Sequence, residues 1–140
     1  MNHLISLKKI KNLDNGSLSF FEAEKDIPFQ IKRIYFIYDV PNKSTRGFHA
    51  HKKLKQALWC LHGSIEVTLD DGHNISKFVL DSPEKLLIVE PITWREMKWL
   101  KDNSTLCVAV SEYYAEDDYI RNYDDFLKNK IGRASCRERV

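Results

Sequence analysis

The sequence has few cysteines, no long hydrophobic run and no low-complexity segment. Its three cysteines, Cys60, Cys107 and Cys136, are odd in number and widely spaced, which fits neither a disulfide framework nor a C-x-x-C zinc or redox site. No apolar stretch approaches the roughly 18 residues of a membrane span. The N-terminal stretch MNHLISLKKIKNLDNG also lacks the apolar core of a signal peptide. We therefore expect a soluble protein of the reducing cytoplasm, without a membrane partner.

Most of the chain also lacks an excess of positive charge. The formal net charge is +2, and residues 133–140, with three arginines and one glutamate, supply all of it. Because the remainder is neutral, composition gives nucleic acid binding no electrostatic support. The sequence contains neither a nucleophile elbow nor a P-loop, so acyl and phosphoryl transfer have no support either.

What the sequence does contain is a series of short apolar stretches. With 140 residues, the chain has the length of about one domain. The spacing predicts strands at residues 31–40, 58–61, 65–70, 78–80, 86–89 and 106–110. Residues 31–40 carry bulky side chains on both faces, which predicts a strand buried on both sides, and Asp71-Gly72 predicts a two-residue hairpin turn. Short strands at regular spacing indicate an all-β sandwich or barrel.

Only the C-terminal region changes its hydrophobic period. A helical stripe follows the acidic residues 116–118 and consists of Tyr119, Ile120, Tyr123, Phe126 and Leu127. Acidic residues suit a helix N-terminus, so this pattern predicts one helix that packs on the sheet. We assign residues 1–131 to one domain and predict a disordered basic tail at residues 132–140, for which a non-native origin is one hypothesis.

Two of the five histidines, His49 and His51, are separated by one residue. On a strand their side chains would point to the same face, and Ala50 would point to the other. An isolated pair of this kind is more often solvent-facing or hydrogen-bonded than catalytic. The spacing of HAHKKLKQALWCLHG nevertheless resembles the first motif of the metal-binding cupins.

Two of the four cupin metal ligands are missing. Gln56 stands where those proteins have an acidic ligand, and a neutral amide binds a divalent cation poorly. The second cupin motif should supply a histidine near Pro91, but the stretch PITWREM contains none. We therefore expect no metal, and we predict that the histidine pair is free to transfer protons at neutral pH.

Hydrogen-bond donors accompany the histidines. Arg46 precedes them in the same stretch, and Arg33 and Tyr35 alternate on the preceding strand so that both face one way. These groups could hold an oxyanion or a diphosphate. Tyr35 could equally belong to the core, and Arg33 could be the solvated end of a strand.

Seven motifs follow one another along the chain: FxIKRxY at 29–35, RGFHAHKK at 46–53, QxLxCLxG at 56–63, LDDG at 69–72, DSP at 81–83, PxxWxEM at 91–97 and SxYYxxxDYIRxY at 111–123. Together they resemble the dTDP-sugar 3,4-ketoisomerases over roughly residues 5–128. The resemblance implies a single-domain cupin-type jelly roll with a short C-terminal helix, usually as a homodimer and without a metal or redox cofactor.

The family's reaction moves the ketone of dTDP-4-dehydro-6-deoxy-D-glucose from C4 to C3 through an enediol. The RGFHAHK and SxYY stretches favour the galacto product, dTDP-3-dehydro-6-deoxy-D-galactose, which would lead to an amino sugar of a surface glycan. By resemblance, His49 is the leading candidate for the carbon acid/base, His51 is its partner between the sugar oxygens, and Tyr35 donates its hydroxyl to the enediolate. The assignment of the two histidines remains open.

The resemblance also implies the residues that bind the substrate. Arg33 and Arg46 would neutralise sugar oxygens or the diphosphate. Gln56 would be a neutral hydrogen-bond partner where a metal ligand has been lost. Glu96 stands where metal cupins have a histidine, so we assign it to the pocket lining, although it could be a rim charge. Asn15 departs from the family, which tends to carry arginine before the glycine there.

Three alternatives remain open at this point. A dTDP-sugar 3,5-epimerase of the same broad fold also removes a proton beside a C4 ketone. A non-catalytic sugar-nucleotide-binding cupin would have no need of paired acid/base groups. A metal-dependent cupin would require stoichiometric metal in the purified protein.

Overall fold

The computed structural model describes residues 1–12 and 14–138, with side chains as far as Ile131 in the C-terminal helix. Its elements, in chain order, are β1 (His3–Ser6), β2 (Lys9–Asn12), β3 (Gly16–Ser19), β4 (Arg33–Ile37), β5 (Thr45–His51), β6 (Gln56–His62), β7 (Ile65–Asp70), β8 (Ile75–Leu80), β9 (Lys85–Val89), β10 (Trp94–Trp99), β11 (Thr105–Val110), the 3₁₀ turn η1 (Glu116–Asp118), β12 (Tyr119–Ile120) and α1 (Tyr123–Glu138).

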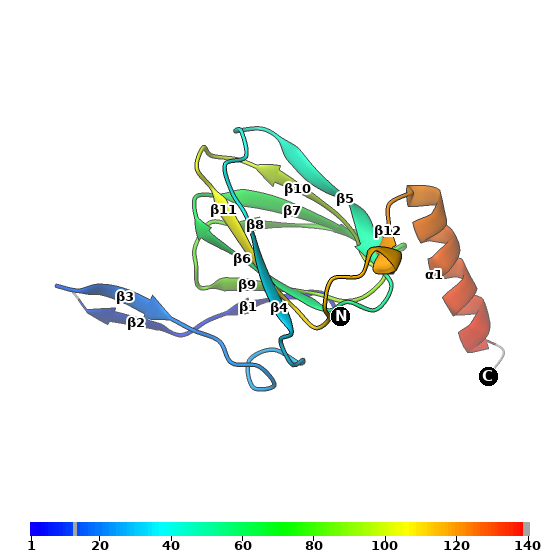
Figure 1. The fold of residues 1–140 in the computed structure, drawn as a ribbon, viewed down its shortest axis with the longest axis horizontal. Coiled ribbons are helices and arrows are strands. Elements are labelled where there is room, and N and C mark those ends of the chain that lie inside the picture. The colour runs from blue at the N-terminus through cyan, green and yellow to red at the C-terminus, as the bar shows by residue number, and fades with distance from the viewer. Residues whose placement is uncertain (13, 139–140) are drawn as a thin grey trace.

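Two antiparallel sheets pack face to face (Figure 1). One has the strand order β1-β9-β6-β11-β4 and the other β12-β5-β10-β7-β8. From β4 to β12 consecutive strands alternate between the sheets, except that β7 and β8 form a hairpin within one sheet, and this is the arrangement of a jelly roll. The predicted all-β, cupin-type fold is therefore confirmed.

The core lies between the two sheets. Period-two alternation directs one face of each strand inward, so β7 buries Ile65, Val67 and Leu69 while Glu66 and Thr68 lie nearer the surface. Opposite them, Leu58 of β6 and Val108 of β11 are also almost fully buried. These apolar side chains fill one part of the space between the two sheets, and a polar cavity lies in the other part.

The prediction for residues 31–40 was wrong in one respect. Strand β4 is the edge of its sheet, and its side chains alternate between half-buried and exposed positions. Arg33 and Tyr35 face inward, while Ile34 and Phe36 are 49% and 57% exposed. No element within the described residues covers that outer face, so bulk on both faces did not mean burial on both.

The turn between β7 and β8 is also longer than predicted. Asp70 pairs with Ile75, so the loop spans residues 71–74 rather than Asp71-Gly72 alone. The Asp71 backbone N–H donates to the Asn74 carbonyl, and the Asp71 carboxylate accepts the N–H groups of His73 and Asn74. These side-chain bonds stabilise the four-residue loop.

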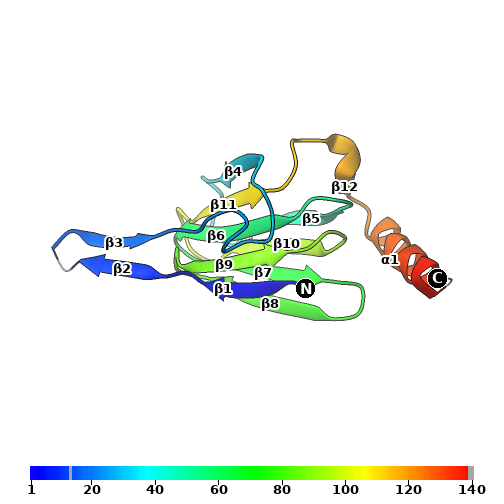
Figure 2. The same ribbon diagram turned by 90° about the horizontal axis from the view of Figure 1, so that it is seen from below.

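The N-terminal strands and β10 were not predicted. Strand β1 pairs with β9, whereas β2 and β3 form a separate hairpin that projects away from the sandwich (Figures 1 and 2). Both hairpin strands are largely exposed along their length.

The C-terminal helix begins later than predicted. Tyr119 and Ile120 form strand β12, which pairs with β5, and α1 begins at Tyr123. Asn122 caps the helix by accepting the Asp125 N–H, and Phe126 packs with Ile120 in a buried cluster. The helix runs to Glu138. Side chains beyond Ile131 and residues 139–140 lie outside the described part of the chain. The disorder expected for the basic tail at 132–140 therefore stays a prediction. Among residues 1–12 and 14–138, no helix has the length and apolarity that a membrane crossing requires.

Candidate active site

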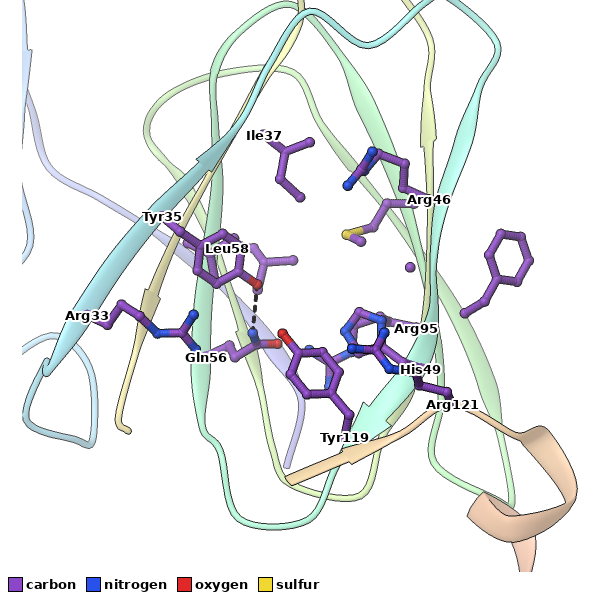
Figure 3. A pocket seen from close by; sticks show the side chains of 14 residues that line it. Arg33, Tyr35, Ile37, Arg46, His49, Gln56, Leu58, Arg95, Tyr119 and Arg121 are labelled. Carbon is purple, nitrogen blue, oxygen red and sulfur yellow. Dashed lines mark hydrogen bonds between the residues drawn. The ribbon is translucent and has the colours of Figure 1, made fainter. Parts of the chain in front are cut away.

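A cavity of about 470 Å³ opens between the two sheets at the end where β5, β10 and β12 face β4 and β6. Five of the residues predicted from the sequence line it: Arg33, Tyr35, Arg46, His49 and Gln56 (Figure 3). A second cavity of about 530 Å³ lies beside α1, and its described lining includes none of the predicted site residues. The first cavity is therefore the candidate site.

A β-bulge in β5 explains how Arg46 and His49 both face this cavity. Residues three apart on a regular strand point to opposite faces, but the pairing of β5 with β10 shifts register between Gly47 and His49. Gly47 and Phe48 have φ values of 102° and 57°, the left-handed region. A Cβ on Gly47 would lie 2.8 Å from a backbone oxygen of β10, so glycine is required there. The Arg-Gly before the histidines thus aligns the arginine with them.

The two histidines share one face, as predicted. Their ring centroids are 4.9 Å apart with the planes nearly perpendicular, and Ala50 is buried on the opposite face. His51 lies deeper than His49 and pairs across the strands with Tyr119, at 4.4 Å between ring centroids. Burial and then the charge of Arg95 lower the pKa of His49 to about 4, which leaves its imidazole neutral at pH 7.

Asp118 fixes the tautomer of His51. Its Oδ2 lies 3.0 Å from His51 Nδ1, and because a carboxylate only accepts hydrogen bonds, Nδ1 carries the proton. The Lys53 N–H donates to Asp118 Oδ1 at 2.8 Å, which holds the carboxylate in place. Burial first, then Arg95, lower the pKa of His51, so the ring is neutral and Nε2 keeps its lone pair. Within the described residues Nε2 has no hydrogen-bond partner.

Tyr35 and Gln56 form a pair on the opposite sheet. Gln56 Nε2 donates to the Tyr35 hydroxyl oxygen at 3.0 Å, the dashed line in Figure 3. Burial raises the pKa of Tyr35, so the phenol stays protonated and its O–H is available to donate. Gln56 Oε1 is buried without a partner in the described part of the chain. Both groups can therefore bind a substrate oxygen or hydroxyl.

The described cavity lining contains four arginines, Arg33, Arg46, Arg95 and Arg121, and no carboxylate. Arg33 and Arg46 were predicted, whereas Arg95, Arg121 and Tyr119 were missed. Arg121 lies 4.2 Å over the Tyr119 ring and also pairs with Glu116. A concentration of positive charge in a nearly neutral chain indicates an anionic ligand.

Glu96 does not reach the cavity, contrary to the expected lining. It neighbours Arg95 on β10, and successive residues on a strand point to opposite faces. Arg95 and Met97 point inward, while the Glu96 carboxylate accepts a hydrogen bond from Trp94 Nε1 at 3.1 Å on the outer face. No group of three or more histidine, cysteine, aspartate or glutamate side chains suited to a metal ion occurs among the described residues.

Comparisons with known proteins agree with one another. A family model described as "FdtA: WxcM-like, C-terminal" matches residues 1–131. A TDP-4-oxo-6-deoxy-alpha-D-glucose-3,4-oxoisomerase from Aneurinibacillus thermoaerophilus is 50% identical over 127 residues, which cover 91% of each chain.

Two solved structures are also similar. QdtA, a sugar 3,4-ketoisomerase from Thermoanaerobacterium thermosaccharolyticum in complex with TDP, is 42% identical with a TM-score of 0.89, over 94% of this chain and 96% of that one. WlaRB, a TDP-quinovose 3,4-ketoisomerase from Campylobacter jejuni, is 40% identical with a TM-score of 0.86, over 91% and 97% of the two chains.

Proposed function

Because the chain belongs to the FdtA, WxcM-like C-terminal family, we propose that it is a sugar-nucleotide 3,4-ketoisomerase, an intramolecular oxidoreductase. The family assignment confirms the resemblance predicted from the sequence. The proposed substrate is dTDP-4-dehydro-6-deoxy-D-glucose, whose ketone moves from C4 to C3. The relative at 50% identity, named for a TDP-4-oxo-6-deoxyglucose, supports this substrate. The observation that carries the proposal is a pair of neutral histidines in ring contact, of which His49 lines a cavity that arginines also line and His51 lies buried beside it.

The arginines support binding of the nucleotide diphosphate. Arg46 is exposed at the cavity mouth, and Arg33, between the rings of Tyr35 and Tyr114, is half-buried. Guanidinium groups bind phosphate oxygens through charge-assisted, often bidentate, hydrogen bonds. We assign the diphosphate to Arg33 and Arg46, and the sugar to the deeper part of the cavity beside Gln56.

The reaction needs a base at the sugar carbon. We assign His49, which lines the cavity, to removal of the C3 proton. The C–H electron pair forms a C3=C4 double bond, and the C4 carbonyl electrons move to O4, which gives an enediolate. A proton then returns to carbon at C4, the O3 hydroxyl loses its proton as C3=O forms, and O4 takes up a proton to become the C4 hydroxyl. Protons are only relocated, so the reaction balances without an external oxidant or reductant.

His51 and Tyr35 complete the proton transfers. His51 Nε2 has no hydrogen-bond partner among the described residues, which suits it to accept a proton from a sugar hydroxyl. Asp118, bonded to Nδ1, would stabilise the imidazolium that results. The Tyr35 O–H is suited to donate to the developing oxyanion. Gln56 holds the Tyr35 oxygen and leaves that O–H free to point toward the sugar.

The configuration of the product at C4 has two candidates. The sequence motifs favour the galacto product, dTDP-3-dehydro-6-deoxy-D-galactose. The 40% identity to a TDP-quinovose 3,4-ketoisomerase supports the gluco product instead, because quinovose is 6-deoxyglucose. Proton NMR of the product in ordinary water distinguishes them. The C4 and C5 hydrogens are both axial in the gluco sugar and couple strongly, whereas the equatorial C4 hydrogen of the galacto sugar couples weakly.

We further propose that the protein is a homodimer. The outer face of β4 exposes Ile34 and Phe36, and Tyr38, directly after the strand, is 64% exposed. The projecting hairpin exposes Ile10 and Leu18 by 49% and 55%. An isolated hairpin is marginally stable in water, and exposed apolar patches mark interaction sites. Light scattering during size-exclusion chromatography should give twice the mass of 16.5 kDa; a monomer would contradict the proposal.

Cytoplasmic location and a role in surface-glycan synthesis remain predictions.

The experiment for the activity is proton NMR of dTDP-4-keto-6-deoxyglucose with the enzyme in deuterated water. We compare wild type with His49→Ala and His51→Ala, and with His73→Ala as a control at an exposed loop histidine. A 3-keto product that is labelled at C4, and is lost only in the first two variants, supports the ketoisomerase. Label at C5 supports the 3,5-epimerase, and binding without conversion supports a sugar-nucleotide-binding cupin. Stoichiometric metal in the purified protein would favour a metal-dependent cupin.

A further inference from the structure

Arg95 is a charged side chain buried at the base of the cavity. It lies on β10, pairs across the strands with His49, and is only 2% exposed. Its Nη2 donates to the Thr93 carbonyl at 3.0 Å. Within the described residues, its Nε and Nη1 have no hydrogen-bond partner. Burial lowers the pKa of Arg95 to about 10, which still leaves the guanidinium charged at pH 7.

This charge is also not neutralised by an ion pair in the described part of the chain. Asp118 is near enough to act on Arg95 electrostatically, but its carboxylate bonds to His51 and Lys53. A buried charge without a partner costs several kcal/mol, and such groups are retained mainly at functional sites. The missing partner of Arg95 is therefore expected to be an oxygen of the bound ligand.

The position of Arg95 indicates which part of the ligand supplies that oxygen. Arg33, Arg46 and Arg121 are all more exposed, nearer the solvent side of the cavity, where a diphosphate would remain accessible to water. Arg95 instead lies among the groups that transfer protons, and its charge acts on His49, His51 and Tyr35. The base of the cavity is thus positive at the place where the sugar ring would react.

We propose that Arg95 is a catalytic residue that stabilises the enediolate formed on the sugar. This inference rests on the proposed ketoisomerase function. When the base takes the C3 proton, the electron pair of the C3–H bond forms C3=C4, and the former carbonyl pair places negative charge on O4. Return of a proton to C4, protonation of O4 and loss of the O3 proton leave the ketone at C3 and a hydroxyl at C4. A fixed guanidinium beside both oxygens favours the charged intermediate over the neutral substrate and product.

The test uses Arg95→Met and Arg95→Lys, with Lys98→Met as the matched control, because Lys98 is exposed on the same strand. Conversion of the 4-keto sugar is followed by NMR, TDP affinity by calorimetry, and folding by the melting temperature. We expect kcat to fall by about 100- to 1000-fold in Arg95→Met, as when one oxyanion donor is removed. TDP affinity should stay within about threefold, and Arg95→Lys, which keeps the charge, should recover part of the rate.

The pH profile gives a readout that a merely structural role would not move. His49 is faced by Arg95 from β10, Arg121 and Tyr119 from the segment around β12, and His51 from its own strand. Removing the charge of Arg95 should raise the pKa of His49, so the acid limb of kcat/KM should move to higher pH.

Several outcomes would overturn this role of Arg95. One is a folded Arg95→Met variant with kcat within about fivefold of wild type. Another is a loss of TDP affinity as large as the loss of rate, because Arg95 would then bind the diphosphate. An unmoved acid limb would also contradict it. If wild type binds TDP but does not convert the sugar, the proposed function itself fails and this inference fails with it.

Discussion

Replacing Asp118 with asparagine tests whether this residue orients and activates His51. The variant is nearly isosteric, and its amide oxygen can still accept the Lys53 N–H that now bonds to Oδ1. The amide NH₂ would then face His51 Nδ1, where the carboxylate now accepts a hydrogen bond. Because two donors cannot face each other, the His51 proton should move to Nε2. His51 Nε2 would then lose the lone pair that we assign to accepting a proton from a sugar hydroxyl.

The size of the effect follows from the geometry of this hydrogen bond. The Nδ1–Oδ2 distance is 3.0 Å, and the side chains of His51 and Asp118 are only 2% and 14% exposed, so water screens the interaction weakly. A hydrogen bond to a charged group contributes about 1.5–3 kcal/mol. Each 1.36 kcal/mol in barrier changes a rate by about tenfold. We therefore expect kcat to fall by about 10- to 150-fold.

The assay is the initial rate of 3-keto product formation by NMR, with TDP affinity measured on the same preparations. Asp117→Asn is the matched control, because Asp117 precedes Asp118 and is exposed. The control should retain the wild-type rate, and both variants should bind TDP normally. A kcat for Asp118→Asn within about threefold of wild type, at an unchanged melting temperature, would refute the orienting role of Asp118.

Two further predictions concern pH dependence and stability. Because burial and the neighbouring Arg95 lower the pKa of His49 from 6.5 to about 4, the imidazole stays neutral as the pH falls. The acid limb of kcat/KM should lie well below pH 6.5 in a pH–rate profile, and an acid limb near 6.5 would contradict this environment. Gly63→Ala should destabilise the fold by about 2–3 kcal/mol in urea unfolding, because φ is +95° and a Cβ would lie 2.0 Å from Ser104 Oγ. Gly16→Ala is the control, since φ is +91° but no atom lies within 4 Å, and an equal loss in both variants would exclude the steric contribution.

Hydrophobic period and turn residues predicted most of the sandwich. The alternation of Ile65, Val67 and Leu69 with polar residues gave β7 because a two-sheet core buries one face of each strand. The same reasoning failed where a neighbour decides burial. Residues 31–40 were predicted to be a strand buried on both faces, but no described element covers the outer face of β4, where Ile34 and Phe36 are exposed. Tyr119 and Ile120 fit a helical stripe, yet pairing with β5 outweighs that local preference.

Site residues on β4 and β5 were predictable for a different reason. Arg33 and Tyr35 are two apart, so their common direction follows from strand geometry alone. That Arg46 joins His49 required a bulge, and the only local signal of it was Gly47. Asp118 could not be placed by such reasoning. It is 67 residues from His51 along the chain, and nothing in the local pattern of 116–118 distinguishes a hydrogen-bond partner from a helix-capping charge.

The alternation of side chains along β10 could have shown from the sequence that Arg95, and not Glu96, faces the cavity. The resemblance to metal cupins directed attention to Glu96. Arg95, however, shares its parity with Met97 and Trp99, two large apolar residues that are buried between the sheets. A strand that buries those two side chains in the core must direct Arg95 inward and Glu96 outward. A cationic side chain that a strand directs into the core is stabilised in few ways. Its partner is a protein carboxylate, an anionic ligand, or first one and then the other. The second fits a cavity whose proposed chemistry creates negative charge on the sugar.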